Sequence, residues 1–216
     1  SLGAFAILMG LSLVFLFDRP LVLLFGFAGM FLALFYNAPP FALKYRAVGE
    51  PATFMGFFLM FVGTYYVMTG TVTWESIVLG LPPGLLTASV LSTNNIRDID
   101  NDRRAGFRTL AVVLGRKGMA SLIVVMISVT FISVLSMIML DKLPLLSLVA
   151  FITLPAALGV IRDIYNEFIS LKAEGGAEDA PVRVSKIEVQ MLYILAITLL
   201  AAFVLEPFLA QFDLPI

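Results

Sequence analysis

The chain contains no cysteine and no histidine, and it has few charged residues. Only 13% of its 216 residues are charged, whereas about a quarter of a typical soluble domain is charged. These absences exclude disulfides, zinc–thiolate sites, haem ligation by histidine and histidine acid–base chemistry within this sequence. Any reaction must therefore use carboxylates, amides, hydroxyls, lysines, arginines or tyrosines. The net charge of −1 also argues against non-specific binding to nucleic acid.

Apolar residues are abundant: they make up 60% of the chain, and the mean hydropathy is +1.01. A helix needs roughly 17–25 mostly apolar residues to cross the hydrocarbon core of a bilayer. Seven apolar runs approach or reach this length, which predicts an all-α, polytopic bundle of transmembrane helices. The predicted spans are Leu2–Phe17, Pro20–Tyr36, Pro51–Gly70, Ser76–Thr93, Gly118–Leu140, Leu143–Ile161 and Ile187–Leu205.

The basic residues predict which side of the membrane each loop occupies. Loops 37–50, 94–117 and 162–186 fall on one side and hold two, six and four of the 14 lysines and arginines. Only Arg19 and Lys142 fall on the other side. By the positive-inside rule, the three basic loops are cytoplasmic and the protein is integral to the cell membrane, with several passes.

Charge is concentrated directly after the fourth predicted span. Seven of the twelve residues from Arg97 to Arg108 are charged. Asn94, Asp98 and Asp102 are spaced by four, so on a helix they share one face. Because two carboxylates on one face repel each other, either arginines or a bound metal must offset them. Sparse oxygen ligands suit Mg²⁺, which keeps several waters and shares its shell with substrate phosphates.

A simpler interpretation of this segment is a solvated helix end with internal salt bridges. Its position favours a functional role, because Asn94 and Asn95 follow Leu91–Thr93 directly and the polar stripe thus begins within an apolar span. The flanking arginines are suitable partners for phosphate oxygens. They are Arg97, Arg103, Arg104 and Arg108.

The run N-N-I-R-D-I-D-N-D-R-R-A-G-F-R-T-L-A, from Asn94 to Ala111, resembles the second aspartate-rich motif of the UbiA superfamily of intramembrane prenyltransferases. It is most similar to the branch that prenylates 1,4-dihydroxy-2-naphthoate and to related menaquinone-forming enzymes, with the pattern N-N-x-R-D-x-x-x-D-x-x-x-G-x-x-T-L-A. Phe107 stands where that branch often has Lys. The resemblance implies a bundle of nine transmembrane helices, with Mg²⁺-diphosphate held between two aspartate-rich motifs.

The resemblance also implies roles for single residues of the acidic segment. Asp98 and Asp102, with Asn94 assisting, would hold Mg²⁺ and through it the diphosphate. Arg97 and Arg104 would neutralise the charge that develops on the leaving group.

A second loop resembles the family more weakly. Tyr36, Lys44 and Gly49 match a family pattern in which a Tyr is followed seven or eight residues later by Lys and then by Gly. The resemblance implies that Lys44 binds diphosphate and that the ring of Tyr36 faces the reacting allylic cation. A membrane-interface anchor and a positive-inside pair are the simpler interpretation of this loop. Arg46 and Arg162 are further candidates for substrate binding.

The family's first N-D-x-x-D motif is absent from this sequence, which also begins without Met. With seven spans in place of nine, we expect residues 1–216 to form a single transmembrane prenyltransferase domain that lacks two N-terminal helices. Asp163 and Glu167, again spaced by four, are a conceivable substitute for the missing motif, although a solvated helix end explains them more simply.

Together these features predict Mg²⁺-dependent transfer of a prenyl group from a polyprenyl diphosphate to an aromatic quinone precursor within the lipid bilayer. One alternative is prenyl transfer to a non-quinone acceptor. Another is a cation transporter with Asn94, Asp98 and Asp102 along its path. Against transport, no ionisable residue stands out well inside another span, where an ion relay would need one. The sequence does not specify the acceptor, the prenyl chain length or the oligomeric state.

Overall fold

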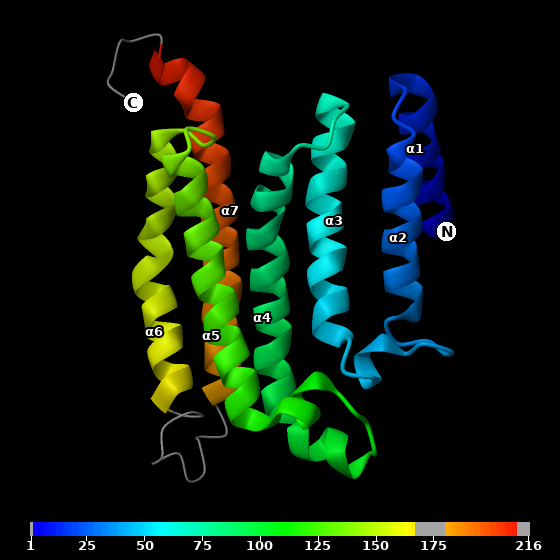
Figure 1. The fold of residues 1–216 in the computed structure, drawn as a ribbon, viewed down its shortest axis with the longest axis vertical. Helices are drawn as coiled ribbons and strands as arrows, with labels where there is room; N and C mark the ends of the chain where they lie inside the picture. The colour runs from blue at the N-terminus through cyan, green and yellow to red at the C-terminus, as the bar shows by residue number, and fades with distance from the viewer. Residues whose placement is uncertain (1, 167–179, 211–216) are drawn as a thin grey trace.

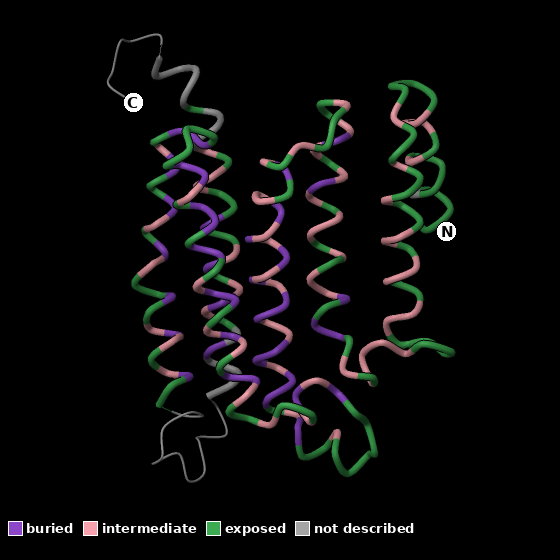
Figure 2. The backbone as a smooth tube through the Cα atoms, viewed as in Figure 1, coloured by how far each residue is buried: buried purple, intermediate pink, exposed green. Residues whose placement is uncertain are grey.

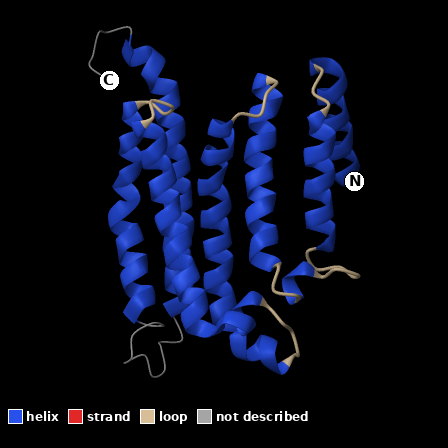
Figure 3. Ribbon diagram, viewed as in Figure 1, coloured by secondary structure: helices blue, strands red, loops and turns tan. Residues whose placement is uncertain are grey.

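The computed structural model describes residues 2–166 and 180–210, and all the regular elements in these ranges are helices (Figure 3). The all-α prediction is therefore confirmed. In chain order the α-helices and the two 3₁₀ helices, η1 and η2, are α1 (Leu2–Phe17), α2 (Leu21–Phe35), η1 (Leu43–Tyr45), α3 (Gly49–Thr69), α4 (Trp74–Arg104), α5 (Leu110–Met139), η2 (Leu145–Thr153), α6 (Leu154–Ile164) and α7 (Ala180–Ala210).

Each of the seven predicted spans corresponds to a helix, the sixth being divided into η2 and α6. Four helical segments are long and apolar enough to cross a membrane: α3, α4, α5 and the combined segment Leu145–Ile164. Helices α1 and α2 are apolar but shorter, with 16 and 15 residues. The structure thus supports a multi-pass membrane protein, while the count of seven spans stays a prediction.

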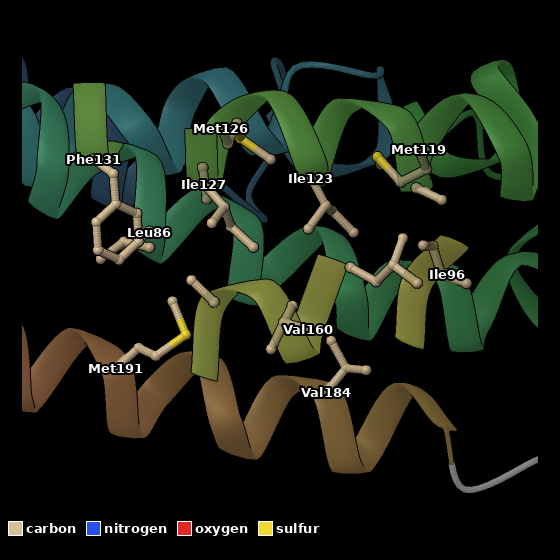
Figure 4. Close-up of a cluster of buried hydrophobic side chains, with 14 of the residues drawn as sticks. Leu86, Ile96, Met119, Ile123, Met126, Ile127, Phe131, Val160, Val184 and Met191 are labelled. Atoms are coloured by element: carbon tan, nitrogen blue, oxygen red, sulfur yellow. The ribbon is translucent and has the colours of Figure 1, made fainter. Parts of the chain in front are cut away.

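The helices stand side by side in a row, with α1 and α2 at one edge and α6 at the other (Figure 1). Helix α4 lies in the middle and packs against α3, α5 and α7. Buried residues gather in α4 to α7, whereas α2 has none (Figure 2). The main core contains Leu86 and Ile96 of α4, Met119, Ile123 and Ile127 of α5, Val160 of α6, and Val184 and Met191 of α7 (Figure 4).

Helix α4 extends well past the end of its predicted span. The span was predicted to end at Thr93, but the helix continues to Arg104, because Ile96 and Ile99 keep one face of the extension buried. Helix α4 ends just before Gly106, whose positive φ of 77° suits glycine. The whole acidic segment is therefore helical.

The start of α5 also differs from its prediction. The helix begins at Leu110 instead of Gly118, and it is bent at Gly115, where φ is 70°. Thr109 caps its first turn, with its hydroxyl accepting a hydrogen bond from the Val112 amide at 3.4 Å. The connection between α4 and α5 is therefore short, and it returns the chain directly into the bundle.

Helices α3 and α4 approach each other closely where α4 carries glycine. A Cβ placed on Gly84 would lie 2.8 Å from the Phe54 ring and 2.9 Å from the Phe54 carbonyl oxygen. A Cβ on Gly80 would lie 2.9 Å from the ring of Phe58. Lipid tails are as apolar as these side chains, so helix association in a bilayer depends on close packing of this kind. The two glycines therefore fix the register of α4 against α3.

We expect Gly84→Ala to destabilise the protein by about 1–3 kcal/mol, because the backbone of α3 cannot move away from the added methyl group. Thermal unfolding in detergent measures the effect. Gly26→Ala in α2 is the matched control, since no atom lies within 4 Å of a Cβ at that position. Equal unfolding temperatures for the two variants would contradict the close α3–α4 contact.

Candidate active site

Two loops with candidate residues meet at one end of the bundle, hereafter the loop end (Figure 1). They are the α2–α3 loop, residues 36–48, and the α4–α5 connection, residues 105–109. Their backbones pair in a short parallel bridge between Arg46 and Arg108, and the Arg108 amide donates to the Tyr45 carbonyl at 3.3 Å. The rings of Tyr45 and Phe107 lie 4.2 Å apart between centroids. The fold thus joins the two segments that the sequence singled out.

Asn94, Asp98 and Asp102 share one half-buried face of α4. The Asp98 carboxylate forms an ion pair with Arg97 at 3.1 Å, and both side chains are partly exposed. The Asp102 carboxylate accepts a hydrogen bond from the Thr109 hydroxyl at 3.2 Å. One turn of α4 thus presents the Asp98 carboxylate beside a guanidinium. On the next turn, the Asp102 carboxylate is linked to the start of α5 by Thr109.

The third aspartate of the segment has a different environment. Asp100 forms a salt bridge with Arg116 of α5 at 2.7 Å, and Arg103 lies 3.9 Å away. The contact with Arg116 connects α4 to α5, the contact with Arg103 lies within α4, and neither involves Asp98. The spacing by four therefore distinguishes Asp98 and Asp102, which share a face, from Asp100, which forms a salt bridge between α4 and α5.

The α2–α3 loop folds back on itself so that Tyr36 and Lys44 come together. The Lys44 amide donates to the Tyr36 carbonyl at 3.0 Å. A Cβ on Gly49 would lie 3.2 Å from the Lys44 Cα and 3.7 Å from the Tyr36 hydroxyl, so a small residue is needed there. The Lys44 ammonium lies 5.6 Å from the ring centroid of Tyr45.

The environment of Tyr36 keeps its hydroxyl protonated. Partial burial raises the pKa of Tyr36 above its ordinary value of about 10, a hydrogen bond with the Thr53 side chain opposes the rise, and the nearby Glu50 adds to it. Tyr36 is therefore a neutral phenol at physiological pH, with an electron-rich ring and no full charge.

The remaining candidates are less closely associated with the loop end. Arg46 and Arg104 are exposed, and Arg46 reaches the site through its backbone pairing with Arg108. Arg162 lies on α6, at the opposite edge of the row from α3, where it is 74% exposed and 3.4 Å from Asp163 (Figure 1). Glu167, which was paired with Asp163 in the sequence, lies outside the described residues.

Sequence reasoning missed a buried hydrogen bond next to these candidates. The Asn95 side-chain amide of α4 donates to the Glu50 carboxylate of α3 at 2.8 Å, and the two residues are only 5% and 3% exposed. The available signals were a carboxylate directly before an apolar span and the doubled asparagine of the N-N-I-R-D run. Neither signal says that the two residues meet.

Another missed residue lies at the start of the predicted seventh span. Glu188 of α7 is fully buried and faces the hydroxyls of Ser89 and Thr93 on α4. Neither carboxylate oxygen has a hydrogen-bond partner of normal geometry within the described residues. Glu188 is the second residue of the predicted span Ile187–Leu205, so the expectation that no ionisable residue lies well inside another span stays a prediction.

Comparison with known proteins identifies the scaffold. The model of the UbiA prenyltransferase family matches residues 1–167, most of the chain. The chain belongs to the UbiA prenyltransferase family. This result confirms the family resemblance seen in the acidic segment.

The curated relatives of this UbiA-family chain include 1,4-dihydroxy-2-naphthoate octaprenyltransferases. The Bacillus subtilis enzyme is 26% identical over 147 residues, 67% of this chain and 47% of the relative. The Haemophilus influenzae enzyme is 38% identical over 98 residues, 43% of this chain and 32% of the relative. A Drosophila melanogaster "UbiA prenyltransferase domain-containing protein 1 homolog" is 33% identical over 129 residues, 57% of this chain and 34% of that protein.

The chain therefore spans about a third to a half of the length of these relatives. No solved structure matches it significantly.

We expect spectrophotometric titration in detergent to show a tyrosinate signal, lost in Tyr36→Phe, that develops above the ordinary tyrosine pKa of about 10. Burial disfavours the charged phenolate, so the shift is upward. Thr53→Ala removes the hydrogen bond that opposes the rise and should move the signal to still higher pH. A signal at or below the ordinary pKa would contradict the described environment of Tyr36.

Proposed function

We propose that this UbiA-family chain transfers a prenyl group from a polyprenyl diphosphate to an aromatic quinone precursor, with Mg²⁺ as cofactor. The observation that carries the proposal is the half-buried face of Asn94, Asp98 and Asp102, at the same end of the bundle as Tyr36 and Lys44. Family membership and the names of the relatives favour a naphthoate acceptor. The loop end would face the cytoplasm, as the basic loops predict.

The donor set at the loop end fits part of a magnesium site. Two carboxylates and one amide oxygen lie on one face of α4, and the described residues include no group of three or more carboxylates that could enclose a metal. Mg²⁺ suits such a set because it usually binds through one or two carboxylates, several waters and substrate phosphates. When bound, it would stabilise the negative charge that develops on the diphosphate.

The cationic side chains of the loop end would bind the diphosphate itself. Arg97 is held beside Asp98 by their ion pair, and Lys44 lies in the α2–α3 loop with its ammonium near the ring of Tyr45. Arg46, Arg104 and Arg108 add exposed positive charge around the same end. Donors fixed before reaction stabilise a leaving group at little further cost, since they need not reorganise as the C–O bond breaks.

The allylic carbon would then need an environment that stabilises a cation without supplying water. The ring of Tyr36 provides the first property, because its negative face attracts positive charge. The apolar helices provide the second, since water would otherwise capture the cation. As the C–O bond breaks and the diphosphate departs, an aromatic carbon of the acceptor would form the new C–C bond and would then lose its substituent, as a proton or as CO₂, to restore the aromatic ring.

Asp98→Asn tests this proposal in the full-length protein in detergent, supplied with labelled geranylgeranyl diphosphate, 1,4-dihydroxy-2-naphthoate and Mg²⁺. We expect product formation to fall by about 10²-fold or more, as for loss of a group that stabilises transition-state charge, and EDTA to abolish it. Asp100→Asn is the matched control: it lies two residues away on a different face of the same helix, pairs with Arg116, and should retain activity within a few-fold.

Three outcomes separate the proposal from its alternatives. Equal losses in both variants would contradict the assignment of the acidic face. Release of diphosphate without a prenylated naphthoate would keep prenyl chemistry and reject the acceptor. Neither product nor diphosphate release from folded protein would reject the enzyme, and ion flux in liposomes would then test transport.

A further inference from the structure

The buried contact between Glu50 and Asn95 lies between the two halves of the candidate site. Glu50 is in the first turn of α3, directly after the α2–α3 loop, and Asn95 lies on the part of α4 that carries the acidic face. Their hydrogen bond, at 2.8 Å, is the only fully buried one between two side chains that the structure describes. It therefore links the loop of Tyr36 and Lys44 to the helix of Asp98.

Each partner is adjacent in sequence to residues of the candidate site. Glu50 follows Gly49, which packs against the Lys44 backbone and the Tyr36 hydroxyl. Asn95 lies between Asn94 and Asp98 on a continuous helix. Because side-chain directions on a helix are fixed relative to one another, holding Asn95 also orients Asn94 and Asp98.

Stability alone is a poor explanation for this pair. Helices α3 and α4 are already held together by close packing at Gly80 and Gly84. Hydrogen bonds between helices in membranes contribute little on average, and burying a carboxylate is costly. Buried polar contacts are better known for specifying one register of two helices over others. The position of this contact, at the end next to the candidate residues, suits that role.

We propose that Glu50 and Asn95 are positioning residues that set the α2–α3 loop, with Tyr36 and Lys44, against the part of α4 that carries Asp98. The pair acts through its hydrogen bond and does not touch the substrate. This role rests on the prenyl transfer proposed above.

Two variants that exchange the carboxylate and the amide between positions 50 and 95 test the role without a large change in side-chain shape. Asn95→Asp sets a second carboxylate against Glu50 and breaks the contact. Adding Glu50→Gln restores a hydrogen bond of reversed direction, since the glutamine amide donates to the aspartate. In the full-length protein we expect Asn95→Asp to lower kcat about 10²-fold and to raise the Mg²⁺ concentration for half-maximal rate, with a much smaller change in KM for the prenyl diphosphate. The double variant should recover kcat to within about fivefold.

A structural control distinguishes positioning from loss of stability. Ile127→Ala removes buried side-chain volume from α5 in the apolar part of the bundle and leaves the residues of α3 and of the Glu50–Asn95 contact unchanged. It should lower the unfolding temperature without changing the Mg²⁺ requirement. If Asn95→Asp behaves like this control, or if the double variant is no better than Asn95→Asp, the positioning role is wrong.

A second measurement does not depend on activity. Residues 1–216 contain no cysteine, so spin labels can be attached at Ala38→Cys in the α2–α3 loop and at Asn101→Cys on α4, with any cysteine elsewhere in the full-length protein replaced by serine. We expect the distance distribution to broaden in Asn95→Asp and to narrow again in the double variant; an unchanged distribution would overturn the inference. If the wild-type protein showed no prenyl transfer, the proposed function would fail, while this measurement would still decide whether the pair sets the loop.

Discussion

The close contact between α3 and α4 determines where the candidate residues lie. In a bilayer, apolar side chains gain little by leaving lipid for protein, so the helices need tight packing to adopt one arrangement. Gly80 and Gly84 provide it by admitting the rings of Phe58 and Phe54. Once these contacts fix α3 along α4, the start of α3 falls beside the acidic part of α4. The α2–α3 loop is thereby brought to the α4–α5 connection.

Much of this fold was predictable from hydropathy, and the errors have a common origin. The bounds of α1 agree with the prediction at both ends, because the helix is apolar throughout. The fourth span was predicted to end at Thr93, where the apolar run stops, while the spacing of Asn94, Asp98 and Asp102 already indicated helix beyond it; α4 ends at Arg104. Ile96 and Ile99 continue the buried stripe through Arg104 and were the available sign of a longer helix. Periodicity therefore indicates the helical extension, which mean hydropathy alone does not.

The candidate site was predictable only as two separate halves. Spacing by four placed Asn94, Asp98 and Asp102 on one face and left Asp100 to pair with Arg116. The contacts that join the halves connect residues far apart in the chain. Glu50 and Asn95 are 45 positions apart, and the backbones of Arg46 and Arg108 pair across a whole helical hairpin. A single sequence contains no signal for such pairing, which depends on the packing of α3 against α4.

The polar groups of α4 divide into two classes according to their surroundings, and this division supports different roles. Asn95 is buried and hydrogen-bonded to Glu50, so a substitution there would leave the Glu50 carboxylate unsatisfied away from water and would disturb the α3–α4 contact. Asp98 and Asp102 are half-buried and lie near the loop end, so they remain accessible to a cation and to phosphate oxygens. A polar contact that positions two helices is kept away from solvent, whereas a site for a charged substrate must stay accessible. Because consecutive residues of a helix point about 100° apart, Asn94 and Asn95 can serve these two needs from adjacent positions.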